Sequence, residues 1–244
     1  MDWWANNFAT LAERLPQFAD GVLVTVLLTL GGALGSFIIA LIFGIASSTK
    51  FVLARVISRV FVEFFRGTSL LVQMFFLFFV LPQLGFKLEP LFCGILALAL
   101  NYGAYGAEVV RGSIASVPKG QFEAVNALSL SPARGMFRVV LPQAWALMIP
   151  SFGNLLIQLL KGSAIVSFIT LHDLYFQIEE LRKATGTWFA FGLGLLVYFV
   201  IAYLLTAIMN ALEIVAKHSI GRGPSLGNSL RGLLRPPDDS KVIA

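Results

Sequence analysis

The residues whose types and spacing most clearly suggest a task are those at 123–129, Glu-Ala-Val-Asn-Ala-Leu-Ser, with Val-Val-Leu-Pro following at 139–142. This segment is polar, partly charged and helix-forming, in a chain that is otherwise mostly suited to a membrane. A loop of that kind needs a reason to be ordered, and docking onto a soluble partner is the natural one. The expected chemistry is recognition through one carboxylate and several small side chains.

The flanking residues predict a short helix that carries this segment. Pro118 suits the first turn of a helix, and residues 119–130 favour helix, with Phe122, Val125 and Leu128 near one face. Ser131-Pro132 ends this helix, and a second short piece at 133–140 leads back to an apolar stretch. For an arbitrary loop, a solvated amphipathic connector would be the favoured interpretation.

The spacing resembles the EAA loop in the permease subunits of ATP-binding-cassette (ABC) importers, whose pattern is Glu-Ala-Ala, three residues, Gly, nine residues, Ile-x-Leu-Pro. Here Val125 stands for the third small residue, Ser129 for the Gly and Val139 for the Ile, with the spacing intact. The resemblance reverses the preference for a simple connector and implies an ATPase-docking helix. The docking residues that it implies are Gly120, Phe122, Glu123, Ala124, Val125, Ala127, Leu128, Ser129, Leu141 and Pro142.

Composition places the whole chain in a membrane. Its 244 residues are 57% hydrophobic and only 13% charged, too apolar for an ordinary soluble domain. Five uncharged stretches are long enough, or nearly so, to cross a hydrocarbon core of about 30 Å, and in lipid such stretches must be helices. We therefore predict an all-α integral membrane protein with five transmembrane helices, at residues 21–49, 67–86, 90–107 (continuing past Glu108), 139–160 and 184–212.

Basic residues predict the orientation, because Lys and Arg concentrate in cytoplasmic loops. They cluster between the first and second spans, between the third and fourth, and after the fifth. This pattern predicts an external N-terminus, a cytoplasmic C-terminus and a cytoplasmic Glu123 loop in a bacterial inner or plasma membrane. The expected organisation is an interfacial external segment at 1–20, a permease domain at 21–215 with the coupling loop at about 112–141, and a flexible cytoplasmic tail at 216–244.

Three further stretches resemble the polar amino acid uptake branch of these permeases: residues 64–73, 103–112 and 118–124. The resemblance implies the type I ABC importer permease fold, a second permease subunit that is the same or a related chain, two ATP-binding subunits and an external solute-binding protein. The sequence contains no GxxxxGK[ST] phosphate loop. We therefore expect no cofactor and no enzyme activity in this chain, with ATP and Mg bound by the partner ATPase, and no nucleic-acid partner.

Polar residues at span depth are the candidates for a solute pathway, since such residues often line the substrate path of a transporter. For any one of them, interhelical hydrogen bonding is the commoner role. Lys161 has two alternatives, a functional one facing a solute carboxylate or gate and one in which it reaches the outer interface. The candidate pathway residues are Gln73, Asn101, Tyr102, Asn154, Gln158, Lys161 and Ser163.

Two acid–base pairs at 3-residue spacing, Glu63 with Arg66 and Glu108 with Arg111, are expected to form structural ion pairs. The two histidines are far apart, so no metal site is expected. The family often has an acid or amide after the lysine of the fourth span, where this chain has Gly162. That departure favours zwitterionic or weakly polar solutes, and the form Lys-Gly-Ser-Ala resembles permeases for ectoine and hydroxyectoine.

The sequence thus predicts a permease subunit of an ATP-driven importer for a polar amino acid or an ectoine-type compatible solute. The rival interpretation is a passive channel or an ion-coupled carrier. A carrier would more naturally show acidic residues in mid-span, and residues 139–160 and 184–212 contain none.

Overall fold

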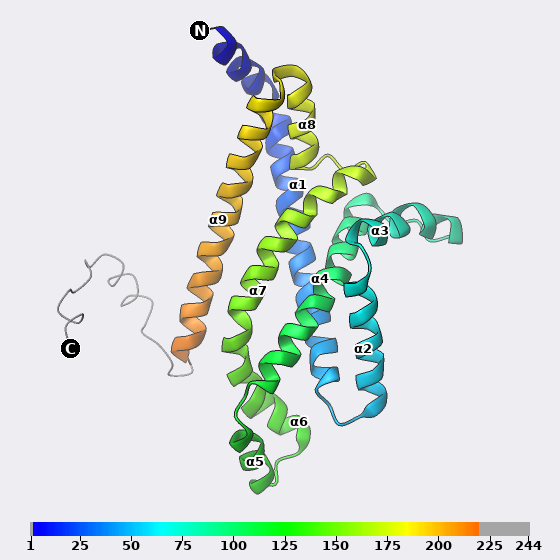
Figure 1. The fold of residues 1–244 in the computed structure, drawn as a ribbon, viewed down its shortest axis with the longest axis vertical. Helices are drawn as coiled ribbons and strands as arrows, with labels where there is room; N and C mark the ends of the chain where they lie inside the picture. The colour runs from blue at the N-terminus through cyan, green and yellow to red at the C-terminus, as the bar shows by residue number, and fades with distance from the viewer. Residues whose placement is uncertain (1, 220–244) are drawn as a thin grey trace, which may run out of the picture.

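The computed structural model describes residues 2–219, and every regular element among them is helical (Figure 1). In chain order these elements are α1 (Asp2–Ser47), α2 (Val52–Gly67), α3 (Leu70–Phe75), the π-helix η1 (Phe76–Val80), the 3-10 helix η2 (Leu81–Leu84), α4 (Pro90–Ala115), α5 (Lys119–Ala127), α6 (Pro132–Gly135), the π-helix η3 (Met136–Val140), α7 (Leu141–Ser163), the 3-10 helix η4 (Ala164–Ile169), α8 (Leu174–Thr185) and α9 (Thr187–Ser219).

The bundle is built from α1, α4, α7 and α9, with α2 beside α4 and α1. We call the end that carries α5 and α6 the α5 end, and the end that carries α8 and the N-terminus the α8 end (Figure 1). Four helices within the described residues are long and apolar enough to cross a membrane, and α2 with residues 70–84 makes a fifth span if a bent pair is counted as one. The predicted all-α architecture is confirmed.

The second span differs from the prediction of one helix at 67–86. The chain leaves α2 at Gly67, continues in extended backbone at Thr68 and Ser69, and resumes in α3 at an angle of 101°. Gly, Thr and Ser are weak helix formers, so a break at this tripeptide costs little. Residues 70–84 consequently project sideways from the bundle (Figure 1).

Two buried amides hold this bend. Gln73 Nε2 donates to the Phe65 carbonyl at 2.9 Å and to Thr68 Oγ1 at 2.6 Å, and Asn101 Nδ2 donates to the same Phe65 carbonyl at 3.0 Å and to Gln73 Oε1 at 3.2 Å. A broken helix leaves carbonyl groups without partners, and burying them unpaired would cost about 1–3 kcal/mol each. Gln73 and Asn101, predicted as pathway residues, therefore use their amide groups to stabilise the break.

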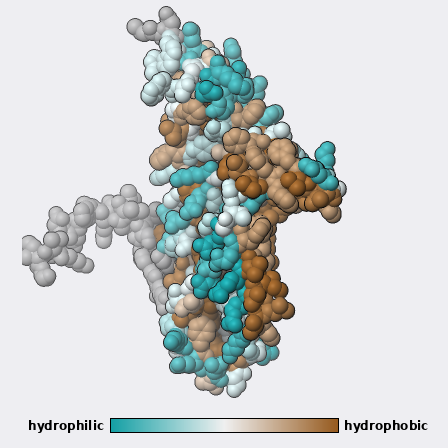
Figure 2. All heavy atoms as spheres, turned by 45° about the vertical axis from the view of Figure 1, so that its right-hand side comes forward, coloured by the Kyte–Doolittle hydropathy of each residue, from teal (hydrophilic) through white to brown (hydrophobic). Residues whose placement is uncertain are grey.

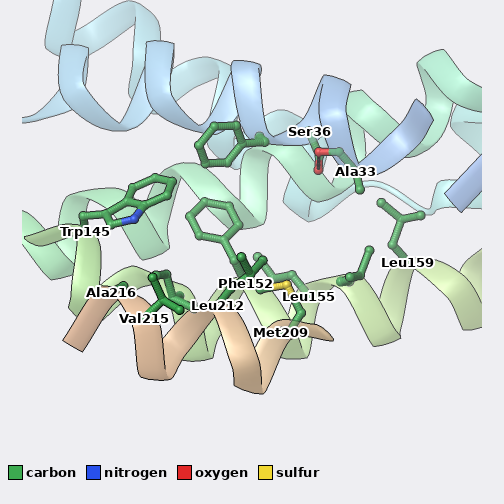
Figure 3. Close-up of a pocket in the computed structure, with 13 residues that line it drawn as sticks. Ala33, Ser36, Trp145, Phe152, Leu155, Leu159, Met209, Leu212, Val215 and Ala216 are labelled. Atoms are coloured by element: carbon green, nitrogen blue, oxygen red, sulfur yellow. Dashed lines mark hydrogen bonds between the residues drawn. The ribbon is translucent and has the colours of Figure 1, made fainter. Parts of the chain in front are cut away.

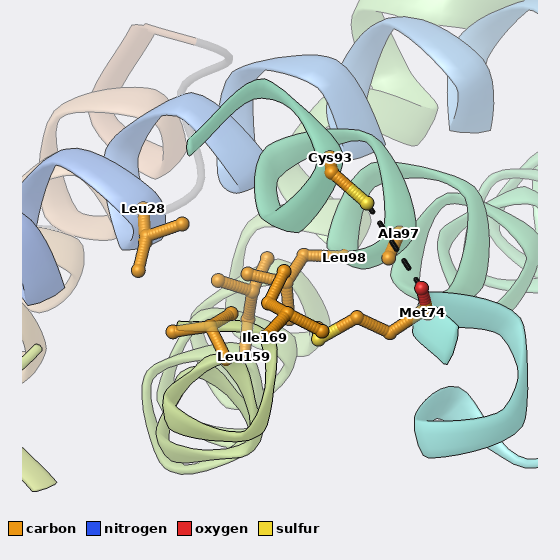
Figure 4. Packing of buried hydrophobic residues seen from close by; sticks show 8 residues of the cluster. Leu28, Met74, Cys93, Ala97, Leu98, Leu159 and Ile169 are labelled. Carbon is orange, nitrogen blue, oxygen red and sulfur yellow. Dashed lines mark hydrogen bonds between the residues drawn. The ribbon is translucent and has the colours of Figure 1, made fainter. Parts of the chain in front are cut away.

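Small residues allow α1 and α4 to pack closely. A Cβ atom added at Gly35 would lie 2.7 Å from the Cβ of Ala99, and one at Gly103 would lie 2.6 Å from the side chain of Ile39. Towards the α8 end, a cluster of buried side chains from α1, α3, α4 and α7 fills the core where these helices meet, among them Leu28, Met74, Leu98 and Leu159 (Figure 4).

Helix α1 passes without interruption through the expected boundary at residue 20. Its first turns pack against α8 and the start of α9 through Leu11, Phe18 and the Phe189 ring, which Trp3 and Phe8 contact edge-on. The placement of residues 1–20 at a membrane surface stays a prediction. Of the expected flexible tail at 216–244, residues up to 219 belong to α9 and the remainder lies outside the described residues.

A buried carboxyl group begins α8. Asp173 is fully buried, and its Oδ1 accepts the backbone N–H of Phe176 at 3.0 Å, which caps the helix. Its Oδ2 has no hydrogen-bond partner within the described residues. Loss of hydration raises the pKa of this carboxyl from 3.8 to about 6, outweighing the opposing backbone N–H groups.

Asp173 is therefore expected to make stability depend on pH. Because its pKa is higher in the folded than in the unfolded state, the folded state binds the extra proton below about pH 6. This contribution to stability is full near pH 4, falls as pH rises and is lost above about pH 6, a change of about 3 kcal/mol. Asp173→Asn keeps the capping oxygen and should unfold at a higher temperature than the parent at pH 7.5, but not at pH 4.5. Thermal unfolding in detergent measures this, and parallel pH curves for both proteins would contradict it.

Candidate functional site

Helix α5 is anchored on one side and open on the other. Val125 is buried against Gly135 of α6, where an added Cβ would collide with it, and Phe122 packs on the core cluster that contains Ile114, Val117 and Val140. The opposite face exposes Glu123, with small side chains beside it, and Leu128 just beyond the helix. Of the predicted docking residues in this segment, those exposed are Gly120, Glu123, Ala124, Ala127, Leu128 (71% exposed) and Ser129.

The chain reverses direction at the end of α5 through a left-handed residue. Ser129 has φ +51°, and the N–H of Leu130 donates to the Val125 carbonyl at 3.1 Å. This is the hydrogen-bonding pattern of a helix C-terminus that favours glycine. The resemblance noted above places a glycine at this position, and the backbone gives its physical reason.

Substitutions at Ser129 should change the order of this loop in opposite directions. Ser129→Gly relieves a left-handed non-glycine residue, worth about 1 kcal/mol or about fivefold in local opening, whereas Ser129→Val adds a β-branched side chain where it is strongly disfavoured. Hydrogen exchange of residues 119–130 should therefore slow in the first variant and quicken in the second. Exchange in α4 serves as the internal control, and equal exchange of the loop in all three proteins would contradict the assignment.

Helix α5 is also connected to α7. Gln143 Nε2 donates to Gln121 Oε1 at 3.1 Å and to the Val139 carbonyl at 3.0 Å. Leu141 and Pro142 open α7, and Pro142 occupies its first turn, where no N–H is needed. Residues 119–142 thus form one packed unit. A displacement of α5 will therefore also displace the start of α7.

Apart from the exposed face of α5, polar side chains also lie along α2, α4 and α7. On α7, Asn154, Gln158 and Lys161 share one exposed face. The Tyr102 hydroxyl of α4 donates to the Gln158 carbonyl at 2.9 Å, and the Tyr102 and Tyr105 rings lie 6.4 Å apart. Figure 2 shows hydrophilic residues at mid-height, bordered by hydrophobic ones. We call the following set the polar strip: Arg55, Arg59, Glu63 and Arg66 of α2, Tyr102, Tyr105, Glu108 and Arg111 of α4, and Asn154, Gln158 and Lys161 of α7.

Charged groups of the polar strip within α4 and α7 lie on helices that can span a membrane. A Lys or Arg side chain in lipid costs at least about 2.5 kcal/mol, so this surface must face water or protein. Glu108 and Arg111 form the expected ion pair, with 2.7 Å between Oε2 and Nη2. Glu63 and Arg66 do not form the expected ion pair, so that prediction is wrong. The Arg66 guanidinium instead lies over the Tyr105 ring, 5.2 Å from its centre.

The structure separates the predicted pathway residues into two groups. Tyr102, Asn154, Gln158 and Lys161 lie on the polar strip. Gln73 and Asn101 lie in the bend, and Ser163 is buried with its hydroxyl donating to the Leu160 carbonyl at 2.8 Å. Sequence reasoning missed Arg55, Arg59 and Tyr105 as members of this surface. The charges at 55, 59, 63 and 66, spaced for one helix face, were the available signal.

An apolar cavity of about 500 Å³ lies between α1, α7 and α9 (Figure 3). Phe152, Leu155 and Met209 point into it, and the Ser36 hydroxyl at its edge donates to the Ala33 carbonyl. Such a lining offers a polar solute few hydrogen-bond partners. The polar strip is the better candidate for contact with a polar solute.

Comparison with known proteins places this arrangement among transport components. Residues 40–214 match the family described as binding-protein-dependent transport system inner membrane component. The chain is 44% identical over 220 residues to a probable amino-acid ABC transporter permease protein (y4tF) of Sinorhizobium fredii, covering 87% of this chain and 89% of the relative. It is 34% identical over 200 residues to the L-cystine transport system permease protein TcyB of Bacillus subtilis, covering 81% and 86%.

Solved structures agree with these relatives. A crystal structure of an amino acid ABC transporter with histidines matches with a TM-score of 0.76 and 30% identity, over 84% of this chain and 97% of the other. The MetNI methionine ABC transporter in an inward-facing conformation shares the fold, with a TM-score of 0.71 at 19% identity, over 84% and 98%.

Proposed function

We propose, from the premise that this chain belongs to the family of binding-protein-dependent transport system inner membrane components, that α5 is the element through which a separate ATPase drives solute import. The chain is a multi-pass membrane protein and a permease subunit of an ABC importer for amino acids, a transport component and not the catalytic subunit. The observation that carries the proposal is the exposed face of α5, with one carboxylate among small side chains on a rigidly anchored helix.

The proposed assembly contains two permease subunits, two ATP-binding subunits that hold ATP and Mg, and an extracytoplasmic solute-binding protein. The α5 end faces the cytoplasm, with the N-terminus outside and the C-terminus inside. This orientation is supported by the positions of Lys and Arg in the sequence. It brings Glu123 to the compartment that contains ATP.

The mechanism is alternating access, in which each ligand shifts the population between two states through its different affinity for them. ATP binding closes the ATPase pair and draws together the α5 helices of the two permease subunits. The Gln121–Gln143 hydrogen bond and the packing of Phe122 transmit this displacement to α7 and α4. The polar strip then changes its exposure from the cytoplasm to the outside, where solute arrives from the binding protein. Hydrolysis and product release reset the cycle.

The solute is proposed to be a polar amino acid or an amino-acid-like compatible solute of the ectoine type. Support comes from the relatives, described as amino-acid permeases, and from the hydroxyl, amide and charged groups along the polar strip.

Affinity purification of the tagged chain from its native membrane in mild detergent, followed by mass spectrometry, tests the assembly. We expect a P-loop ATPase in stoichiometric amount, together with the second permease if it is a different chain. Recovery of the chain without an ATPase in several detergents would contradict ATP coupling and favour a passive channel or ion-coupled carrier.

A further inference from the structure

The polar strip carries an excess of positive charge. Its cationic side chains are Arg55, Arg59, Arg66, Arg111 and Lys161, against two acidic ones, Glu63 and Glu108. Helix α4 connects the parts of the strip, because the Arg66 guanidinium lies over the Tyr105 ring and the Tyr102 hydroxyl donates to the Gln158 carbonyl. An apolar wall flanks this surface, because the other exposed residues of α2 include Val56, Ile57 and Val60.

The carboxylate of Glu108, on α4, is already paired with Arg111. Both carboxylate oxygens of Glu108 accept hydrogen bonds from Arg111, from Nε at 3.1–3.2 Å and from Nη2 at 2.7 Å. By contrast, no ion pair joins Arg66 or Lys161 to a carboxylate within residues 2–219. Outside that pair, the charges of the polar strip are four cations, Arg55, Arg59, Arg66 and Lys161, and one carboxylate, Glu63, so the remaining charge is mainly positive. Glu213 of α9 lines a recess together with Asn154.

The space at Gly162, the residue after Lys161, cannot hold an additional side chain. The Tyr102 hydroxyl occupies the space next to Gly162, where an added Cβ would lie only 2.5 Å from the hydroxyl oxygen. Tyr102 keeps that position through its hydrogen bond to the Gln158 carbonyl. Lys161 itself lines a recess between α7, α8 and α9 with Tyr175, Phe191 and Tyr198. None of the residues that line this recess carries a carboxylate that could receive a second solute cation.

We propose that the polar strip selects solutes by charge, accepting a free carboxylate on a solute of net charge zero or minus one and rejecting solutes with a net positive charge. The inference rests on the proposed function and narrows its substrate class. A surface lined by one sign of charge between low-dielectric walls concentrates counter-ions and repels like charges. With like charges about 7 Å apart and an effective dielectric of about 20, the penalty corresponds to at least about tenfold in affinity after screening.

Equilibrium binding to the purified importer complex tests this with matched probes. The complex is freed of its solute-binding protein by a salt wash, and mass spectrometry verifies the removal. L-citrulline and L-arginine have the same shape and differ in side-chain charge, whereas L-glutamine and L-glutaminamide differ in the carboxylate. We expect citrulline to bind at least about tenfold more tightly than arginine, and glutamine at least about tenfold more tightly than glutaminamide.

Substitutions in the polar strip test whether its charged side chains cause these binding preferences. Lys161→Gln should reduce the preference for glutamine over glutaminamide, and Arg66→Gln should reduce that for citrulline over arginine. Lys183→Gln, whose lysine pairs with Glu180 on α8 away from the strip, is the matched control and should change neither ratio. Size-exclusion profiles of each complex verify folding.

The outcomes separate this inference from the proposed function. Equal or tighter binding of arginine, or no binding of any probe to a complex that contains the ATPase, would overturn charge selection while leaving ATP-driven import intact. Absence of the ATPase from the purified chain would overturn the proposed function. Charge selection would still be supported if that chain distinguished citrulline from arginine as expected.

Discussion

Replacing Glu123 by Arg will leave the chain folded in the membrane and abolish ATP-driven solute uptake. Glu123 is exposed on α5, so its replacement disturbs no internal packing. A cation in place of a docking carboxylate removes a charged hydrogen bond and leaves its partner group unpaired, which typically costs about 2–5 kcal/mol at an interface. The amount of ATPase recovered per permease should fall by at least tenfold, with unchanged abundance of the permease in the membrane.

Glu13→Arg is the matched control for this experiment. It makes the same substitution at an exposed position of α1 near the α8 end. Recovery of the ATPase should be unaffected in this variant. Equal recovery from Glu123→Arg and the parent protein would show that the α5 carboxylate has no part in docking.

The second large effect concerns the packing of α1 on α4. Gly44→Leu will prevent the close approach of these helices, because even an added Cβ would lie 2.5 Å from the Cβ of Val110 and 2.8 Å from the Ala107 carbonyl oxygen. A backbone carbonyl cannot move aside as a flexible side chain can. Overpacking of this kind costs about 1–3 kcal/mol or more, so we expect a much lower unfolding temperature and a strongly reduced yield of folded protein.

Gly192→Leu provides the comparison. Gly192 belongs to α9, which can also span a membrane, and nothing lies within 4 Å of an added Cβ there. This variant should unfold at nearly the same temperature as the parent protein. If both leucine variants behave alike in detergent unfolding, the contact between α1 and α4 is not the site of close packing that the structure describes.

The spans could be predicted because their cause is local. A long uncharged apolar stretch has to form a helix in lipid, whatever it packs against. The bend at Gly67–Ser69 could not be predicted in the same way, since it depends on Gln73 and Asn101, which reach the Phe65 carbonyl from other parts of the chain. From the sequence, Gln73 and Asn101 were assigned to the pathway because they are polar residues at span depth. The sequence does not show which groups their side chains contact.

The docking helix was predictable for a different reason. Its start at Pro118, its ending before Ser131-Pro132 and the spacing of its apolar residues are all short-range features. The left-handed backbone at Ser129 was visible only in the structure, because serine does not itself indicate φ above zero. The arginines of α2 were interpreted as signs of topology. Their role as part of the polar strip depends on α4 lying beside α2, which no single segment encodes.

Site-specific photo-crosslinking at the face of α5 tests most directly the claim that this helix transmits the work of a separate ATPase. A photoreactive residue at Leu128, 71% exposed beside α5, should crosslink to a P-loop ATPase in native membranes, and the yield should change with ATP. The same residue at Leu195, 75% exposed on α9, should not. If neither position crosslinks to the ATPase in membranes where the chain is folded and abundant, the proposed role of α5 is contradicted.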